Sequence, residues 1–212
     1  WNAAIPTAGE EFDRIFSRCR YGAPVDYFPM LLWPLDGGLP FAKGFGARLK
    51  HRLNRYQYVA KDAEAELAEF ENQLAHSPFE GYALFFALGN RREGCEKLLA
   101  ILERLLSEAK FHRFELANFR FTTLATLAFI HLALGAAGAR AIREKRIFAP
   151  YLITPELVRR DLLEYAALCE AAREAYGEAY LPHVRPELME RHLAELFPAE
   201  WDALAQKILA EL

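Results

Sequence analysis

Residues 121–139 read FTTLATLAFIHLALGAAGA and carry no formal charge, which limits how this chain can fold more than any other feature. A helix needs about 20 predominantly apolar residues to cross the hydrocarbon core of a bilayer, so a membrane span has to be weighed. Three threonines and His131 interrupt the stretch, however, and its last five positions hold only glycine and alanine. Neither edge carries a Trp or Tyr for an interfacial belt. We therefore interpret 114–142 as the buried central helix of an all-α fold, with a span as the less favoured alternative.

Helix-start signals recur along the rest of the chain, whereas sustained alternation of apolar and polar residues does not. The capping box at 7–10 predicts a helix over 8–20. Ser77-Pro78 predicts another start, and Gly89-Asn90 predicts that this helix ends near Leu88. Because a second leucine-rich helical pattern follows, we expect a helical hairpin over 78–109.

Three further proline signals predict the C-terminal part of the fold. Thr154-Pro155 starts a long helix, and Pro186 and Pro198 start two short ones, so 155–212 is expected to be helical. Gly135 and Gly138 lie near the end of the expected central helix, where they would let a neighbouring helix approach closely.

The exception to this helical pattern is the segment 21–46, which holds four prolines and five glycines. An ordinary helix does not survive prolines at this spacing. Its aromatic and apolar residues favour a strap packed over the helices, and a loop that grips a ligand is the alternative. The whole chain is thus expected to form a single domain of about seven or eight helices around the central one, with a Pro/Gly-rich strap near its N-terminus.

Composition and motifs give no sign of a catalytic centre. A net charge of −3 supplies no general attraction for nucleic acid. Three cysteines without a CxxC pair are typical of reduced thiols in the cytoplasm. The chain holds no phosphate-binding loop, no HExxH and no GxSxG. We therefore predict no catalytic residue, no metal site and no cofactor.

Two histidines have the spacing to a glutamate that could suggest a metal site. His112 with Glu115, and His192 with Glu195, have HxxE spacing, but helical di-metal sites use the reverse order and add further inward-facing glutamates. We interpret both pairs as solvated polar faces. His131 is expected to be a neutral, hydrogen-bonded residue of the core.

The most informative polar region is 47–76, which is expected to form a long helix with a heptad-type apolar seam. Basic residues fill its first half and acidic residues its second half, which is the reverse of what helix ends prefer. The basic anion- or partner-binding candidates are Lys43, Arg48, Lys50, Arg52 and Arg55. The acidic partner-binding candidates are Glu64, Glu66, Glu69 and Glu71. Two antiparallel copies would satisfy both sets, although another helix of the same chain could occupy the seam instead, which the high apolar content of the chain slightly favours.

These observations favour a cytoplasmic, non-catalytic protein-interaction module, such as an adaptor, an inhibitor or a bacterial immunity-type partner. It would act through its charge-segregated helix faces on another protein or on a second copy of itself. The first alternative is an enzyme or ligand-binding protein with a pocket between the Pro/Gly-rich segment and the central helix. The second is a membrane-associated component.

Overall fold

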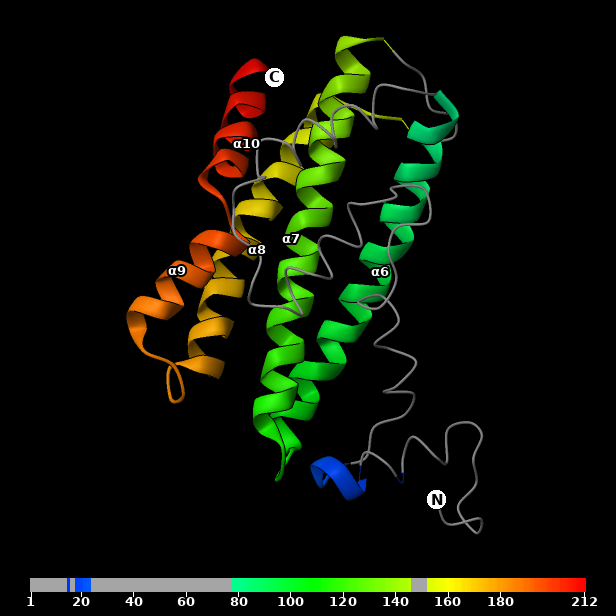
Figure 1. Cartoon of the computed structure of the whole chain (residues 1–212). Helices are drawn as coiled ribbons and strands as arrows, with labels where there is room; N and C mark the ends of the chain where they lie inside the picture. The colour runs from blue at the N-terminus through cyan, green and yellow to red at the C-terminus, as the bar shows by residue number, and fades with distance from the viewer. Residues whose placement is uncertain (1–14, 16–17, 24–77, 146–151) are drawn as a thin grey trace.

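The computed structural model of the chain describes residues 15, 18–23, 78–145 and 152–212, and these form helices, turns and short connections without strands (Figure 1). The helices are α6 (Pro78–Glu108), α7 (Arg113–Arg143), α8 (Pro155–Tyr180), α9 (Pro186–Leu196) and α10 (Ala199–Glu211). The all-α prediction is confirmed for this part of the chain. The described residues leave out most of the expected helix over 8–20, most of the Pro/Gly-rich strap and all of the expected helix over 47–76. The predicted number of helices in the whole chain therefore stays a prediction.

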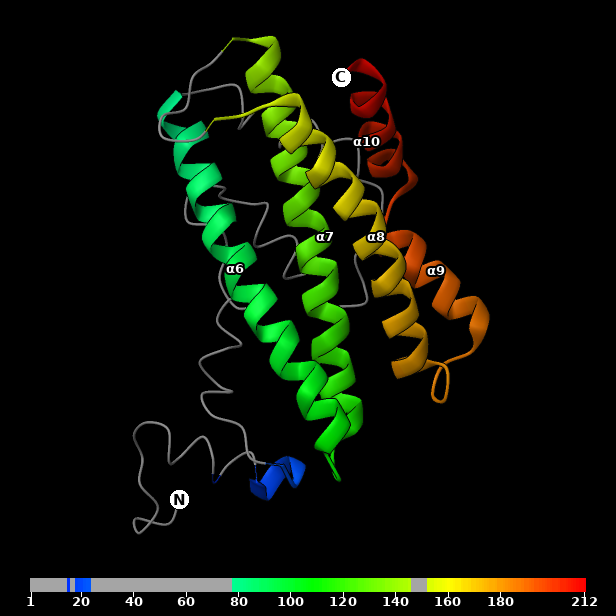
Figure 2. The same cartoon turned by 180° about the vertical axis from the view of Figure 1, so that it is seen from behind.

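α7 is the central element. α6 and α8 run antiparallel to it on either side, and α9 and α10 cover the side away from α6 (Figures 1 and 2). Nineteen residues of α7 are buried, between Leu116 and Ala141. Among the described residues α7 is the one helix long and apolar enough to cross a membrane, and its apolar window is entirely buried by the rest of the protein. The central buried helix is therefore confirmed, one residue longer at each end than predicted.

α8 approaches α7 closely because the facing turn of α7 lacks side chains. A Cβ atom added at Gly135 would lie 2.5 Å from Cδ2 of Leu162, and one at Gly138 would lie 2.7 Å from Cγ2 of Val158. These two side chains of α8 occupy the space that larger residues on α7 would fill. The predicted close approach at both glycines is confirmed, and it sets the spacing of the two helices.

The expected hairpin over 78–109 is wrong, because α6 continues without a break through Gly89. A glycine inside a helix costs only about 1 kcal/mol relative to alanine, so it does not by itself end one. Packing outweighs this cost. Leu88, Cys95, Leu98, Leu102 and Leu105 are all buried, and they lie on one continuous face that a break at Gly89 would disrupt.

The helix starts predicted from proline signals are confirmed. The Thr154 side chain accepts a hydrogen bond from the Leu157 amide at 3.2 Å, so it caps α8 as expected. α9 begins at Pro186, and α10 begins directly after Pro198. Each proline occupies a position where its missing amide hydrogen removes no helical hydrogen bond.

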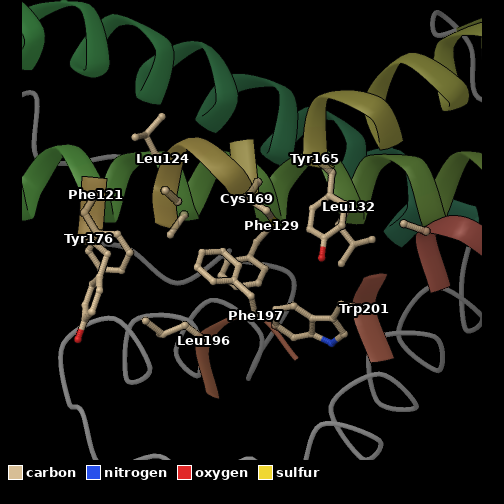
Figure 3. Packing of buried hydrophobic residues seen from close by; sticks show 14 of the residues in the cluster. Phe121, Leu124, Phe129, Leu132, Tyr165, Cys169, Tyr176, Leu196, Phe197 and Trp201 are labelled. Carbon is tan, nitrogen blue, oxygen red and sulfur yellow. The ribbon is translucent and has the colours of Figure 1, made fainter. Parts of the chain in front are cut away.

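An aromatic cluster fastens the C-terminal helices to α7 (Figure 3). The rings of Phe129 and Trp201 meet edge to face with centroids 4.5 Å apart, and Phe129 stacks on Phe197 at 5.8 Å. Arg173 of α8 covers the Phe197 ring at 5.2 Å. This cluster explains why the C-terminal helices fold back onto α7.

The three thiols should differ sharply in reactivity. Burial raises the pKa of Cys95 to about 12 and the pKa of Cys169 to about 11, whereas Cys19 is exposed. At about pH 8 we expect a thiol reagent to modify Cys19 rapidly and the other two only when the protein unfolds, because the thiolate is the reactive form. Mass spectrometry of the labelled peptides measures this order. Rapid native-state labelling of Cys95 or Cys169 would show that the core is more open than described.

Candidate functional site

A buried polar cluster joins the three long helices. Nδ1 of His131 on α7 lies 3.0 Å from Oδ1 of Asp161 on α8, and a guanidinium nitrogen of Arg92 on α6 lies 3.7 Å from the same oxygen. His131 is 7% exposed and Asp161 is 4% exposed, while the Arg92 side chain is 30% exposed. An ionised carboxylate can only accept hydrogen bonds, so Nδ1 of His131 is the donor.

The close approach of α7 and α8 places this cluster. His131 lies one helical turn before Gly135, and Asp161 directly precedes Leu162, which packs against Gly135. The expectation of a hydrogen-bonded core histidine is confirmed, but its partner Asp161 and the covering Arg92 were not predicted. One signal was present in the sequence: Asp161 follows Val158 by three positions and therefore lies on the buried face of α8.

This arrangement could serve proton transfer or metal binding, because a carboxylate on one ring nitrogen orients the other toward a ligand. Metal binding needs more ligands than this cluster offers. Within the part of the chain that the structure describes, no group of three or more His, Cys, Asp or Glu side chains is arranged to hold a metal ion. The contacts that the cluster does make are contacts between helices.

An open groove lies at one end of the three helices, near the turn between α6 and α7. Its volume is about 540 Å³. Ala117, Ala175 and Ala179 line it with small side chains, and the ring of Phe114 is also part of the lining. Proteins commonly bind ligands in concave sites of roughly 300–1,000 Å³, so the groove is large enough to receive side chains of a partner.

Arg120 links the two sides of the groove. Its guanidinium lies 3.3 Å from Glu178 on α8 and 3.9 Å from Glu103 on α6. Both glutamates are exposed, and salt screens pairs of this kind. Two acids thus face one cation in the lining of the groove, so Arg120 is not left unpaired.

Phe114 is held in place although 46% of it is exposed. Its ring meets the rings of Tyr180 and His183 edge to face, at centroid distances of 5.3 and 5.2 Å. The Tyr180 hydroxyl in turn donates to Oδ1 of Asn118 at 2.7 Å. Phe114 therefore presents a fixed apolar surface to solvent.

The corner between α6 and α7 completes this end of the molecule. All five residues of 110–114, KFHRF, are exposed, so two aromatic rings lie among three basic residues. His112 adopts a left-handed conformation with φ 51°, which turns the chain into α7. The amides of Lys110 and Phe111 donate to the carbonyl oxygen of Tyr21 at 2.8 and 3.2 Å, so residues 18–23 support the corner.

The side chain of Glu115 strengthens this support. Two guanidinium nitrogens of Arg20 donate to Oε2 of Glu115 at 2.6 and 3.0 Å. Oε1 of Glu115 accepts from Nε of Arg20 at 3.3 Å and from the Tyr21 hydroxyl at 3.1 Å. Burial and the nearby Glu115 raise the pKa of Tyr21 to about 12. Because the hydroxyl thus stays protonated, it remains a donor at neutral pH.

The interpretation of the two HxxE pairs as solvated polar faces needs correction. His112 is exposed, but Glu115 is engaged by Arg20 and Tyr21. Nδ1 of His192 lies 3.0 Å from the Tyr176 hydroxyl, and the Glu195 side chain lies outside the description. Glu115 and His192 take part in contacts between segments of the chain because they lie where neighbouring segments meet.

The site residues predicted from the sequence all lie in 24–77, outside the described residues. The basic set is Lys43, Arg48, Lys50, Arg52 and Arg55, and the acidic set is Glu64, Glu66, Glu69 and Glu71. Both sets therefore stay predictions. The groove and its corner were missed because Phe114 and the alanines match an ordinary helix pattern, and only the run KFHRF departs from it.

Comparison of the chain with protein-family models, with curated proteins and with solved structures finds no match.

Proposed function

We propose that the chain is a non-catalytic protein-interaction module and that the groove beside Phe114 is one of its contact surfaces. The observation that carries this proposal is the exposed ring of Phe114, packed against Tyr180 and His183 in the lining of a concave, alanine-rich surface. Aromatic side chains are enriched at the centres of protein interfaces, because they bury a large area at a small cost in conformational entropy. A fixed ring lowers that cost further.

The charges of the groove also fit a protein partner. Since Arg120 is balanced by Glu103 and Glu178, an apolar side chain could enter without leaving an unpaired cation beneath it. A groove of about 540 Å³ would receive a few side chains of a partner rather than a whole domain. The contact would therefore suit a protruding segment of the partner.

The features predicted outside the described residues belong to the same proposal. The charge-segregated helix over 47–76 would supply a second surface, for another protein or for a second copy of this chain. The Pro/Gly-rich segment would complete a fold of about seven or eight helices as a strap. The groove does not depend on either expectation.

Site-specific photocrosslinking tests the proposal. A benzophenone amino acid at position 114 should capture a partner polypeptide in cells that produce the protein. The matched control carries the same group in place of Leu163, which is 57% exposed on α8 and is not a groove residue. Phe114→Ala should weaken binding of the captured partner by about tenfold, as loss of an interface anchor does, and Leu163→Ala should leave it unchanged. Equal capture at both positions, or equal binding by both alanine variants, would refute the proposal.

A further inference from the structure

We infer that the segment bound in this groove is acidic, with an apolar anchor residue flanked by carboxylates. This inference rests on the proposed function and specifies the chemistry of the partner. Its basis is the rim of the groove at the 110–114 corner. Arg113 lines the groove, and Lys110 lies three residues before it in the same corner. Both are exposed, and neither forms an ion pair with another residue that the structure describes. One guanidinium nitrogen of Arg113 donates to the carbonyl oxygen of Ala109 at 3.1 Å, which steadies the side chain and leaves the rest of its fork available.

The two acids nearest the corner are paired with other arginines, whereas the two acids in the rest of the groove share one arginine and leave one negative charge over. Glu108 is paired with Arg104 at 3.3 Å, and Glu115 is paired with Arg20 at 2.6 Å. Glu103 and Glu178, on the other parts of the groove, share Arg120. The positive charge of the rim is therefore concentrated where the exposed aromatic residues lie.

The N-terminus of α7 adds to the positive charge of the corner. Its N-cap residue is His112, whose side chain makes no capping hydrogen bond. The N-terminus of a helix carries a partial positive charge, and the acidic residue in the first turn of α7, Glu115, is itself paired with Arg20. A carboxylate near Arg113 would meet both the guanidinium and this helix end.

The same observations weigh against other anionic partners. Membrane surfaces are typically bound by clusters of roughly four to eight Lys and Arg. This corner offers Lys110 and Arg113, whereas the nearby Arg20 and Arg120 are paired with glutamates. Nucleic acid calls for a basic stripe, whereas the chain carries a net charge of −3. An acidic peptide needs only a few local cations and an apolar pocket. The groove supplies both.

Selection from a displayed library of random linear peptides tests the inference with the full-length protein as bait. We expect the enriched peptides to be rich in Asp and Glu around one large apolar residue. They should compete with one another for the groove beside Phe114. Synthetic versions of these peptides should bind the double variant Lys110→Glu, Arg113→Glu at least about tenfold more weakly than the parent protein, because reversing charges at an interface weakens binding. The matched control, Arg159→Glu, Lys207→Glu, reverses two exposed cations elsewhere and should bind like the parent. Thermal melting of both variants establishes that they are folded.

The outcomes separate this inference from the proposed function. Peptides that need Phe114 but are neutral or basic would overturn the acidic partner and leave the interaction surface standing. Acidic peptides that bind both double variants equally would also overturn it. If no peptide is enriched over a bait with Phe114→Ala, both proposals fail. Phosphatidylserine vesicles and single-stranded DNA serve as competing probes, and tighter binding of either than of the selected peptides would overturn the acidic-peptide assignment.

Discussion

Replacing Asp161 with alanine is expected to lower the free energy of unfolding by about 3 kcal/mol, since it leaves a buried donor without its acceptor. His131 would lose its only described hydrogen bond, and Arg92 would lose its partner across the helices. Denaturant unfolding followed by circular dichroism measures the change. Arg92→Ala should cost far less, because 30% of the Arg92 side chain is exposed and water can replace the contact.

A double replacement tests whether the loss of stability comes from the unpaired histidine. If the cost of Asp161→Ala comes from the stranded histidine, then His131→Leu combined with Asp161→Leu should recover most of the lost stability, because two apolar side chains of similar size can replace a buried polar pair. Additive losses in the double variant would contradict this account. A single Asp161→Ala variant that unfolds at the same denaturant concentration as the parent would show that the cluster contributes nothing.

Gly135→Val should be as damaging, by about 3 kcal/mol, because it overfills a packed contact between helices. The first added carbon would lie 2.5 and 2.7 Å from two atoms of Leu162, closer than carbon atoms approach without displacement. α8 would have to move, and Asp161 would move with it. Thermal and denaturant unfolding both report the loss.

The same chain offers a matched control for helical glycine. A Cβ atom added at Gly89 meets nothing within 4 Å, so Gly89→Ala should stabilise α6 by about 0.5–1 kcal/mol through helix propensity alone. The two substitutions thus have opposite expected signs although both remove a glycine from a helix. Comparable losses at both positions would mean that backbone effects, rather than crowding against Leu162, dominate.

Local signals in the sequence predicted helix starts well and helix ends poorly. Thr154 and the prolines act within one turn of the chain, so their effect does not depend on what lies across the core. Gly89 has an equally local signal, but the buried face of α6 overrides it. The central helix was predictable because an uncharged, apolar stretch of this length has to be buried in a folded protein.

The candidate site was less accessible from the sequence, because its parts come from separate helices. His131 was recognisable as a polar group in an apolar stretch, whereas Arg92 and Asp161 lie in charge-rich stretches that resemble any exposed helix face. The groove arises where three alanines of two helices face one another beside Phe114, and no spacing along one helix reveals such a meeting. Only the exposed run KFHRF carried a trace of it.

The support of the α6–α7 corner by Arg20 and Tyr21 has a consequence for how the protein folds. The contact between Arg20 and Glu115 joins residues 95 positions apart, whereas the three long helices pack as neighbours along the chain. Closing so long a loop costs entropy before the contact returns any stability. Contacts of this kind form late and slow folding, while local helix pairs form early. On a ribosome, Tyr21 cannot contact the corner until Glu115 has emerged, so the corner takes its final shape only after α6 has been synthesised.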